Sequence, residues 1–160
     1  MKKLTLSILT CLIFLTPNMV MSETMDDLVK RDGVYFKKFS DVPFTGNITG
    51  EGSFKNGKME GVWVRYFDNG QLYTKGNWKN GKWEGAYFAY YENGQLGIKG
   101  NHKNGKPDGA WFRYHENGQL YTKGNRKNGK REGAWVIYNP DGIVNKKYTG
   151  TYKNGKKISD

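Results

Sequence analysis

Cysteine and histidine are scarce in this chain, whose 160 residues include one cysteine and two histidines. A disulfide framework requires cysteines in pairs, and a metal centre usually takes several cysteine or histidine ligands. We therefore expect no disulfide scaffold, no metal site and no bound cofactor.

Glycine, aromatic residues and positive charge are abundant instead. The chain has 22 Gly, 5 Trp, 11 Tyr and 8 Phe, and its 26 Lys and Arg exceed its 15 Asp and Glu, which gives a net charge of +11. A protein this basic is drawn to anionic surfaces.

The first 22 residues have the pattern of a removable export signal. Two lysines are followed by an apolar run from Leu4 to Leu15 and by a cleavage site at Val20-Met21-Ser22. The run is shorter than the roughly 20 residues that span a bilayer. We predict cleavage after Ser22 and a periplasmic or secreted mature chain. Lipidation of Cys11 is the less favoured alternative, because Thr10 stands where a small residue is usual.

The rest of the chain is built from a repeated unit. An Asn-Gly-Lys triplet starts at Asn56, Asn80, Asn104 and Asn128, each number 24 above the one before, and recurs at Asn154. A second series lies between these triplets and starts at Asn69, Asn93, Asn117 and Asp141. Asn-Gly and Asp-Gly are typical of two-residue hairpin loops, because a type I′ turn needs positive φ at both central residues. Each unit therefore contains two turns.

Segments of strand length join these turns. Residues 62–67 and 110–114 are rich in aromatic and β-branched residues and show no helical period. Two-residue loops place each strand beside its predecessor, so we predict an all-β fold, an elongated and twisted antiparallel meander of about ten strands without helices. We divide the mature chain into a cap hairpin with a partial repeat (23–51), tandem repeats (52–138) and a divergent terminal repeat (139–160).

Aromatic residues face glycines across these hairpins. If Asn69-Gly70 is a two-residue loop, residues whose numbers sum to 139 lie opposite each other, which pairs Trp63 with Gly76 and Phe67 with Leu72. We expect each ring to lie over the glycine that it faces, as in the aromatic rescue of strand glycines. In later units the same arithmetic pairs Tyr87 with Gly100 and Trp111 with Gly124.

These phrases resemble MORN repeats, in the variant type of YwqK-like bacterial proteins of the antitoxin family. The matching phrases are Tyr-Glu-Asn-Gly-Gln-Leu (91–96), Gly-Asn-Trp-Lys-Asn-Gly-Lys-Trp-Glu-Gly (76–85) and Glu-Gly-Ala-Trp (132–135), and Pro-Phe-Thr-Gly (43–46) resembles the motif that opens such proteins. The resemblance covers roughly residues 28–156. It implies a twisted antiparallel sheet with a role in scaffolding, membrane attachment or toxin neutralisation.

Charge is expected to separate onto the two long edges of the sheet, because alternate turns of a meander share an edge. Lysines flank every turn of one edge, at Lys55, Lys58, Lys79, Lys82, Lys103, Lys106, Lys127 and Lys130, with Lys153 and Lys156 in the last unit. Consecutive pairs would stand about 9.6 Å apart, two strand spacings of about 4.8 Å, and could bind an anionic surface. Alternatively these lysines only keep the turns soluble, partly neutralised by Glu60, Glu84, Asp108 and Glu132. The other edge carries Asp68, Glu92, Glu116 and Asp141.

The other candidate binding residues are aromatic or vary between repeats. The recurring series Trp63, Tyr87, Trp111 and Trp135 is either a platform for sugar rings or an apolar partner, or packing over glycine. Two positions vary between repeats: one holds Trp78, His102 and Arg126, and the other holds Phe67, Tyr91 and His115. Because the fold does not dictate these residues, they are candidates for specificity. Alternatively, they vary only through ordinary sequence drift.

A catalytic constellation is not indicated. The hairpin arithmetic places His102 opposite Pro107 and His115 opposite Leu120, so the two histidines do not meet. The acids repeat with the turns, as structural charges do, whereas an active site needs a unique cluster in a cavity. We therefore expect no enzyme.

We expect an exported interaction or scaffold protein of the bacterial envelope that binds a protein or glycan partner. Peripheral binding to anionic lipid through the lysine-lined edge is the first alternative, and antitoxin-like neutralisation of a toxin is the second. Nucleic acid fits the charge but not the export signal, so it is the least expected partner.

Overall fold

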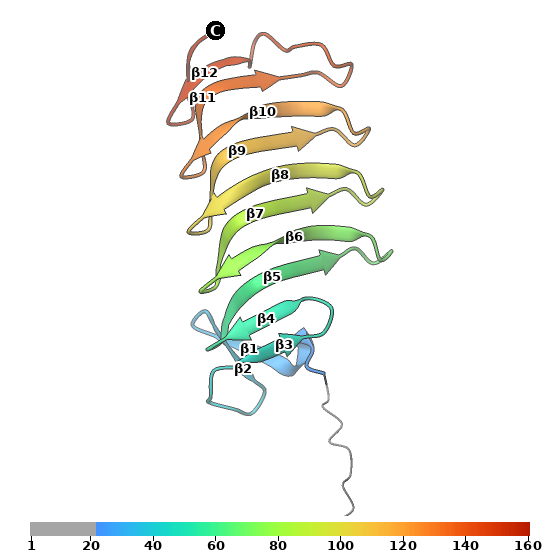
Figure 1. The fold of residues 1–160 in the computed structure, drawn as a ribbon, viewed down its shortest axis with the longest axis vertical. Helices are drawn as coiled ribbons and strands as arrows, with labels where there is room; N and C mark the ends of the chain where they lie inside the picture. Colours follow the sequence, from blue (N-terminus) through green and yellow to red (C-terminus); the bar gives the residue numbers. More distant parts are fainter. Residues whose placement is uncertain (1–21) are drawn as a thin grey trace, which may run out of the picture.

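The strands stack in sequence order into one long antiparallel sheet (Figure 1). The computed structural model describes residues 22–160; the proposed signal segment lies almost wholly outside them. An 11-stranded sheet runs from β3 to β13, and β1 and β2 form a separate two-stranded sheet. The bounds are β1 Leu28–Arg31, β2 Val34–Lys37, β3 Gly46–Ile48, β4 Gly52–Lys55, β5 Lys58–Tyr66, β6 Leu72–Lys79, β7 Lys82–Tyr90, β8 Leu96–Lys103, β9 Lys106–Tyr114, β10 Leu120–Lys127, β11 Lys130–Ile137, β12 Gly150–Lys153 and β13 Lys156–Ser159.

The predicted all-β meander is confirmed, with more strands than expected. One short helical segment departs from the prediction of no helices: η1, a single 3-10 turn at Met25–Asp27. Asp27 accepts hydrogen bonds from the backbone and the hydroxyl of Thr24, both 2.8 Å long, which fixes this turn just before β1.

The Asn-Gly-Lys turns have the predicted type I′ geometry. Asn80 and Gly81 have φ of 50° and 74°, and the flanking Lys79 and Lys82 face each other directly. The other four members of the series, which start at Asn56, Asn104, Asn128 and Asn154, also have positive φ at both residues. Asparagine tolerates this conformation and glycine adopts it freely, which explains the dipeptide.

The second series of turns does not have the predicted two-residue loop. At Asn69-Gly70 only the glycine has positive φ, 81°. The N–H of Gly70 donates to the carbonyl of Phe67 (2.9 Å), and the N–H of Phe67 donates to the carbonyl of Gln71 (2.8 Å). This is a three-residue loop, a type I turn closed by a left-handed glycine. The side chain of Asn69 stabilises it by accepting a bond from the N–H of Gln71 (2.9 Å).

A one-residue bulge cancels the shift that this longer loop introduces. Tyr66, rather than Phe67, faces Leu72, and the register then changes by one before Arg65 pairs with Thr74. Beyond that bulge the predicted pairs return, so Trp63 faces Gly76, Tyr87 faces Gly100 and Trp111 faces Gly124.

The partner that each histidine faces depends on the type of turn beside it. His102 faces Pro107 as predicted. The prediction for His115 is wrong, because Tyr114 is the residue that faces Leu120, and the N–H of His115 closes the loop by donating to Gln119 (2.8 Å).

A second bulge lies within β7, β9 and β11, which follow type I′ turns. Between β6 and β7 the register changes between the Gly76–Tyr87 and Trp78–Trp83 pairs, and Gly85 in this stretch has a φ of 85°. The equivalent glycines Gly61, Gly109 and Gly133 also have positive φ. Glycine is required because such a bulge residue is left-handed.

One face of the sheet carries the packed side chains. Along β6, Thr74 and Gly76 are buried whereas Tyr73, Lys75 and Asn77 are exposed. The buried residues form two clusters: Leu28, Phe44, Ile48, Phe54, Met59 and Trp63 near the N-terminal end, and Trp111, Trp135, Ile137 and Tyr152 near the C-terminal end. The β1–β2 hairpin covers the first cluster, with Tyr35 and Phe54 rings 4.8 Å apart.

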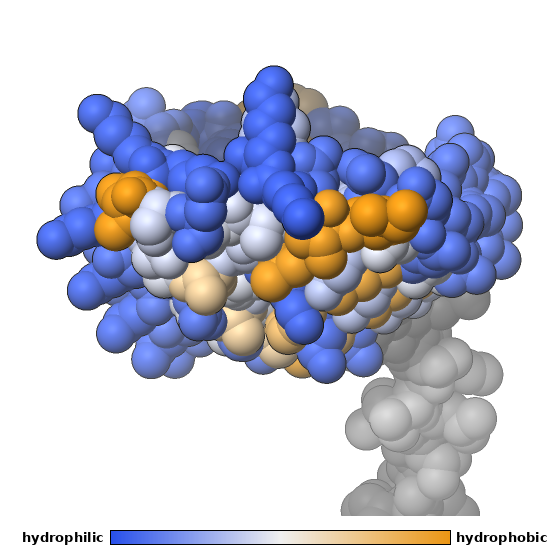
Figure 2. Space-filling model, turned by 90° about the horizontal axis from the view of Figure 1, so that it is seen from above, coloured by the Kyte–Doolittle hydropathy of each residue, from blue (hydrophilic) through white to orange (hydrophobic). Residues whose placement is uncertain are grey.

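The C-terminal end of the stack is not covered in this way. β13 pairs only with β12 and is an edge strand. Figure 2 views this end, where hydrophilic residues surround smaller apolar areas; exposed apolar residues here include Ile143, Val144 and Ile158. The strand is four residues long and contains Lys156 and Lys157, features that protect an edge from unwanted pairing.

Candidate binding surfaces

The seven predicted aromatic and variable residues lie along one face of the sheet. We call this side the aromatic face; its rows contain Trp63, Trp78, Tyr87, His102, Trp111, Arg126 and Trp135. From Trp78 onward, each ring or guanidinium contacts the next. The rings of Trp78 and Trp83 are 4.2 Å apart, and those of Trp83 and Tyr87 are 5.1 Å apart.

The contacts continue into the later repeats. His102 packs edge-on against Tyr87 (5.0 Å) and Trp111 (5.4 Å). The guanidinium of Arg126 lies between Trp111 and Trp135, 5.3 Å and 5.5 Å from their ring centroids. Cations over aromatic rings contribute about 0.5–1 kcal/mol at exposed sites and more when desolvated. The row is therefore continuous from Trp78 to Trp135.

The tryptophan rings cover glycines, but not the ones predicted. A Cβ added to Gly100 would lie 2.2 Å from Trp111, and one added to Gly124 would lie 2.4 Å from Trp135. Trp63 likewise covers Gly52. Each of these rings leans toward the preceding strand, whereas the prediction placed Trp63 over Gly76, Tyr87 over Gly100 and Trp111 over Gly124. Trp83, a residue that the sequence analysis did not single out, covers Gly76.

Hydrogen bonds fix the direction in which these rings lean. The indole N–H of Trp135 donates to the carbonyl of Asn125 (2.9 Å), and that of Trp63 donates to Ser53 (3.1 Å), both on the preceding strand. Trp63 and Trp135 are each 1% exposed and Trp111 is 6% exposed. Their rings are therefore packing elements, and the solvent-accessible part of the aromatic face consists of the half-buried Trp78, Trp83, Tyr87, His102 and Arg126.

The variable position 78/102/126 holds polar atoms without partners. Trp78 Nε1, His102 Nδ1 and Arg126 Nε are buried and make no hydrogen bond within residues 22–160. Burial lowers the pKa of His102, which favours the neutral imidazole. Burial, followed by the charges of Arg131 and Arg113, lowers the pKa of Arg126. The guanidinium keeps one bond, from Nη1 to the carbonyl of Gly129 (2.6 Å).

The second variable position has a structural role. The hydroxyl of Tyr91 donates to the carbonyl of Tyr114 (2.7 Å) in the next repeat, and His115 Nε2 lies 3.4 Å from the carbonyl of Tyr138. Phe67 cannot make this bond and packs on Tyr73 instead, with ring centroids 4.7 Å apart. The polar members of this series link successive turns, which is a sufficient reason for their position.

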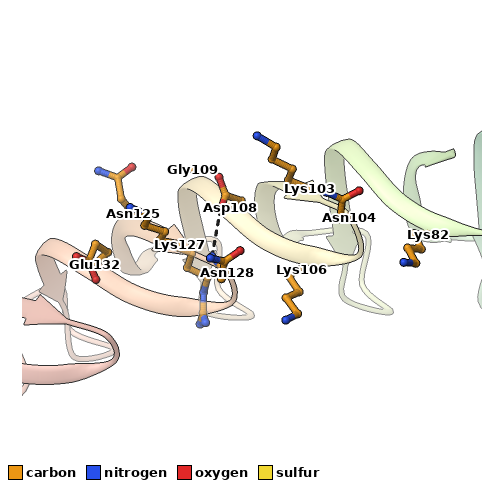
Figure 3. Close-up of a pocket in the computed structure, with 11 residues that line it drawn as sticks. Lys82, Lys103, Asn104, Lys106, Asp108, Gly109, Asn125, Lys127, Asn128 and Glu132 are labelled. Atoms are coloured by element: carbon orange, nitrogen blue, oxygen red, sulfur yellow. Dashed lines mark hydrogen bonds between the residues drawn. The ribbon is translucent and has the colours of Figure 1, made fainter.

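The type I′ turns carry the predicted lysine edge. The two lysines of each turn face each other in register at Lys55–Lys58, Lys79–Lys82, Lys103–Lys106, Lys127–Lys130 and Lys153–Lys156. In Figure 3 the side chains of Lys103 and Lys106 extend away from each other. In the part of the chain that the structure describes, the ion pairs are Arg31–Asp41, Lys37–Glu23 and Lys157–Asp160, so the edge lysines have no carboxylate partner.

The acids of this edge bind backbone rather than lysine. Glu84 accepts a hydrogen bond from the N–H of Asn104 (2.8 Å), the first residue of the next turn. Asp108 accepts from Asn128 (3.1 Å), drawn as a dashed line in Figure 3. Glu60 and Glu132 make the same bond to the turns that follow them. The carboxylates thus link one repeat to the next, and the ammonium groups remain available.

The opposite edge is also linked from repeat to repeat. The side-chain amide of Asn69 donates to the carbonyl of Glu92 (3.2 Å), and that of Asn93 donates to the carbonyl of Glu116 (3.1 Å). The carboxylates of Glu92 and Glu116 lie on exposed loop residues, as do those of Asp68 and Asp141.

A hollow lies along the lysine edge and includes Arg126 in its lining. It has a volume of about 720 Å³ and is lined by Lys82, Lys103, Asn104, Lys106, Asp108, Gly109, Asn125, Arg126, Lys127, Asn128 and Glu132. Five of these side chains are cations and two are acids. The cations therefore exceed the acids by three, and the two acids accept turn N–H groups.

Comparison with known families identifies the repeating unit. The family model of the MORN repeat variant matches residues 59–80, 83–104 and 107–128, three consecutive segments in the same phase of the repeat. Residues 59–128 carry three tandem MORN repeats. Each match begins just after the first lysine of a strand and ends at the asparagine of the next type I′ turn, so the family unit is one hairpin of the sheet. No curated protein matches the chain.

A row of lysines on the other face of the MORN repeats was missed by the sequence reasoning. Lys75, Lys99 and Lys123 are exposed and alternate across the strands with Val64, Phe88, Phe112 and Val136. The signal was the Lys-Gly-Asn phrase that recurs once in each repeat, in which the lysine has the opposite parity to the glycine under the rings.

Two further features bear on function. Among residues 22–160 the structure has no helix long and apolar enough to cross a membrane. The same residues contain no group of three or more His, Cys, Asp or Glu side chains placed to hold a metal ion.

MORN repeats are in general protein-binding or membrane-binding motifs.

Proposed function

We propose that the chain is an exported, non-enzymatic MORN-repeat protein that holds a protein or glycan partner in the bacterial envelope. The observation that carries this proposal is the register of β5 to β11, which aligns equivalent side chains of successive repeats in rows. Lysines form one row at the edge, and half-buried aromatic and cationic side chains form another on the aromatic face. Such rows suit a partner that makes the same contact several times.

The roles of the acids and histidines support binding rather than catalysis. Glu84 and Asp108 accept backbone N–H groups of the following turn, and His102 packs between two rings. These groups are engaged in holding repeats together.

The pairing of Glu23 is compatible with removal of the export signal. Glu23 forms a bridge with Ile48 of β3, and the N–H of Thr49 donates to its carbonyl (3.0 Å). Cleavage after Ser22 would leave this pairing intact. Mass spectrometry of the N-terminus in a fractionated cell tests the step: a mature chain that begins at Glu23 is expected, and an intact Met1 would reject export.

Partner capture tests the interaction role. Tagged mature protein is incubated with envelope extract, alongside a variant of the accessible aromatic face (His102→Ala with Arg126→Ala). An edge variant carries Lys103→Gln, Lys106→Gln and Lys127→Gln. A matched face variant carries Lys75→Gln, Lys99→Gln and Lys123→Gln, an equal change in charge on the opposite face.

We expect a partner that survives washing with the wild type and the face variant but is reduced with the aromatic-face or edge variant. A toxin would be one such protein partner, and co-expression with the mature chain would then restore growth. Capture of nothing, or equal capture by all four proteins, would reject the proposal.

The unpaired edge lysines favour a second candidate, peripheral attachment to anionic lipid. A lysine near an anionic membrane contributes on the order of 1 kcal/mol, so several of them give reversible binding. Vesicles of phosphatidylcholine with phosphatidylglycerol should then bind the wild type at low salt, release it at high salt and bind the edge variant weakly. Binding that salt does not change, or no binding, contradicts this candidate.

A further inference from the structure

The hollow at Arg126 has a counterpart one repeat earlier. A second hollow of about 570 Å³ is lined by Lys58, Lys79, Asn80, Lys82, Glu84 and Asn104. The equivalent residues of the next repeat are Lys82, Lys103, Asn104, Lys106, Asp108 and Asn128, all of which line the first hollow. The repeat therefore builds the same cationic hollow at least twice along one edge.

The lining has two kinds of group that face a ligand. Lysine ammonium groups, free of carboxylate partners, supply positive charge. Asparagine side chains supply amide donors and acceptors, from Asn80 and Asn104 in the second hollow and from Asn104, Asn125 and Asn128 in the first. Cations combined with amides match a ligand that bears both anionic groups and hydroxyls.

Arg126 makes the first hollow the stronger of the two. The position equivalent to Arg126 in the preceding repeat is His102, whose pKa is lowered by burial, so it is largely neutral at pH 7. Stacking between Trp111 and Trp135 holds the guanidinium in one orientation, which reduces the entropy lost when an anion binds.

We propose that these hollows bind a linear anionic glycan along the lysine edge, with one anionic group in each hollow. The inference rests on the proposed interaction function and names the class of its partner. Equivalent points of the two hollows are one repeat apart, two strand spacings or about 9.6 Å. A chain long enough to span that distance engages both hollows at once, and the second contact is then intramolecular.

Binding of oligogalacturonides of increasing length tests the proposal. Calorimetry at low salt compares the wild type, the edge variant and the matched face variant, with neutral dextran as the uncharged control. We expect affinity to rise stepwise once the oligomer spans two hollows. The edge variant should bind about 100-fold more weakly, from about 1 kcal/mol for each of three lysines and 1.4 kcal/mol for each tenfold change. The face variant should change affinity less than about threefold, because screening acts over about 8 Å.

Arg126→His provides a finer test, because it replaces the guanidinium in the first hollow by the residue type found at the equivalent position 102. We expect it to weaken both short and long oligomers, because each of them contacts the first hollow, and its thermal unfolding is measured alongside to confirm that it folds.

Each contrary result has a distinct meaning. Equal losses in the edge and face variants would overturn the proposal, because the attraction would then be general. Binding of phosphatidylglycerol vesicles but not of oligogalacturonide, with loss in the edge variant, would overturn it in favour of a membrane surface. No binding of either probe would also overturn it. Partner capture from envelope extract that depends on the aromatic face would still support the broader interaction function in each of these cases.

Discussion

Replacing Gly124 with alanine tests the packing unit of the sheet. The added Cβ would lie 2.4 to 2.6 Å from three atoms of the Trp135 ring. Carbon atoms in contact prefer about 3.5–4.0 Å, so the ring must move by about 1 Å or more. Trp135 is 1% exposed, and Arg126 and Arg131 stack on it, so little space exists for that movement.

Two effects of Gly124→Ala lower the free energy of unfolding, and one raises it. Overpacking a tight site costs about 1–3 kcal/mol, and displacing the indole weakens its hydrogen bond to Asn125, worth about 1 kcal/mol. Gly→Ala restricts the unfolded chain and recovers about 0.4–1 kcal/mol. We therefore expect Gly124→Ala to lower the free energy of unfolding by about 2–3 kcal/mol, measured by urea denaturation followed by tryptophan fluorescence.

Two companion variants sharpen this test. Gly97→Ala, where the nearest atom belongs to Tyr91 at 3.2 Å, should cost less than about 1 kcal/mol. Gly124→Ala combined with Trp135→Phe should lose less than the sum of the single variants, because the smaller ring removes the clash. A Gly124→Ala protein as stable as the wild type would refute the claim that Trp135 packs directly on this glycine.

Three further predictions concern a link between repeats, a turn residue with positive φ and the buried His102. Glu84→Ala removes the bond to the N–H of Asn104 and should lower the free energy of unfolding by about 1 kcal/mol, with faster hydrogen exchange at the Asn104 amide but not at the Asn128 amide. Asn104→Ala places alanine at a φ of 51° and should cost about 1–2 kcal/mol in urea denaturation, whereas Asn104→Gly should be tolerated. Burial lowers the pKa of folded His102 below its unfolded value of about 6.5, so its contribution to stability is present above pH 6.5 and lost as the pH falls toward the folded pKa. His102→Trp, the residue found at position 78, should abolish that dependence, and an imidazole titration followed by NMR measures the pKa directly.

The sequence was sufficient for the architecture because the repeat specifies it at several levels. The constant period, the Asn-Gly turns and the aromatic strands all indicate the same meander. Type I′ turns at Asn80 and Asn104 follow directly from the positive φ that the dipeptide allows.

The same dipeptide does not determine the second turn, because its conformation depends on the neighbours. Asn69 is preceded by Asp68 and its side chain bonds the N–H of Gln71, which favours a type I turn with only Gly70 left-handed. The register was nevertheless predicted correctly in mid-strand, because the bulge at Tyr73 cancels the extra loop residue. Two deviations that compensate each other leave no trace in residue spacing.

The direction in which each ring leans could not be predicted from the sequence either. Gly124 has an aromatic residue opposite it on both neighbouring strands, Trp111 on β9 and Trp135 on β11. Register alone gives no preference between them. The bond from Trp135 to the carbonyl of Asn125, next to the register shift after Gly124, selects the later ring.

The residues that differ between repeats make the two ends of the lysine edge chemically different. The cross-strand pair nearest the lysine edge changes from one repeat to the next: Trp78 with Trp83, His102 with Pro107, and Arg126 with Arg131. Both members of this pair therefore change together. The pair is apolar in the first of these units, neutral in the next and doubly cationic in the last, while the turns around it are the same from unit to unit. The proposed glycan, lying along this edge, would meet apolar rings at β6–β7 and guanidinium groups at β10–β11, so its more acidic end would be drawn toward the C-terminal repeats. This one pair in each unit would therefore orient the proposed glycan, while the regular lysines would supply most of the attraction.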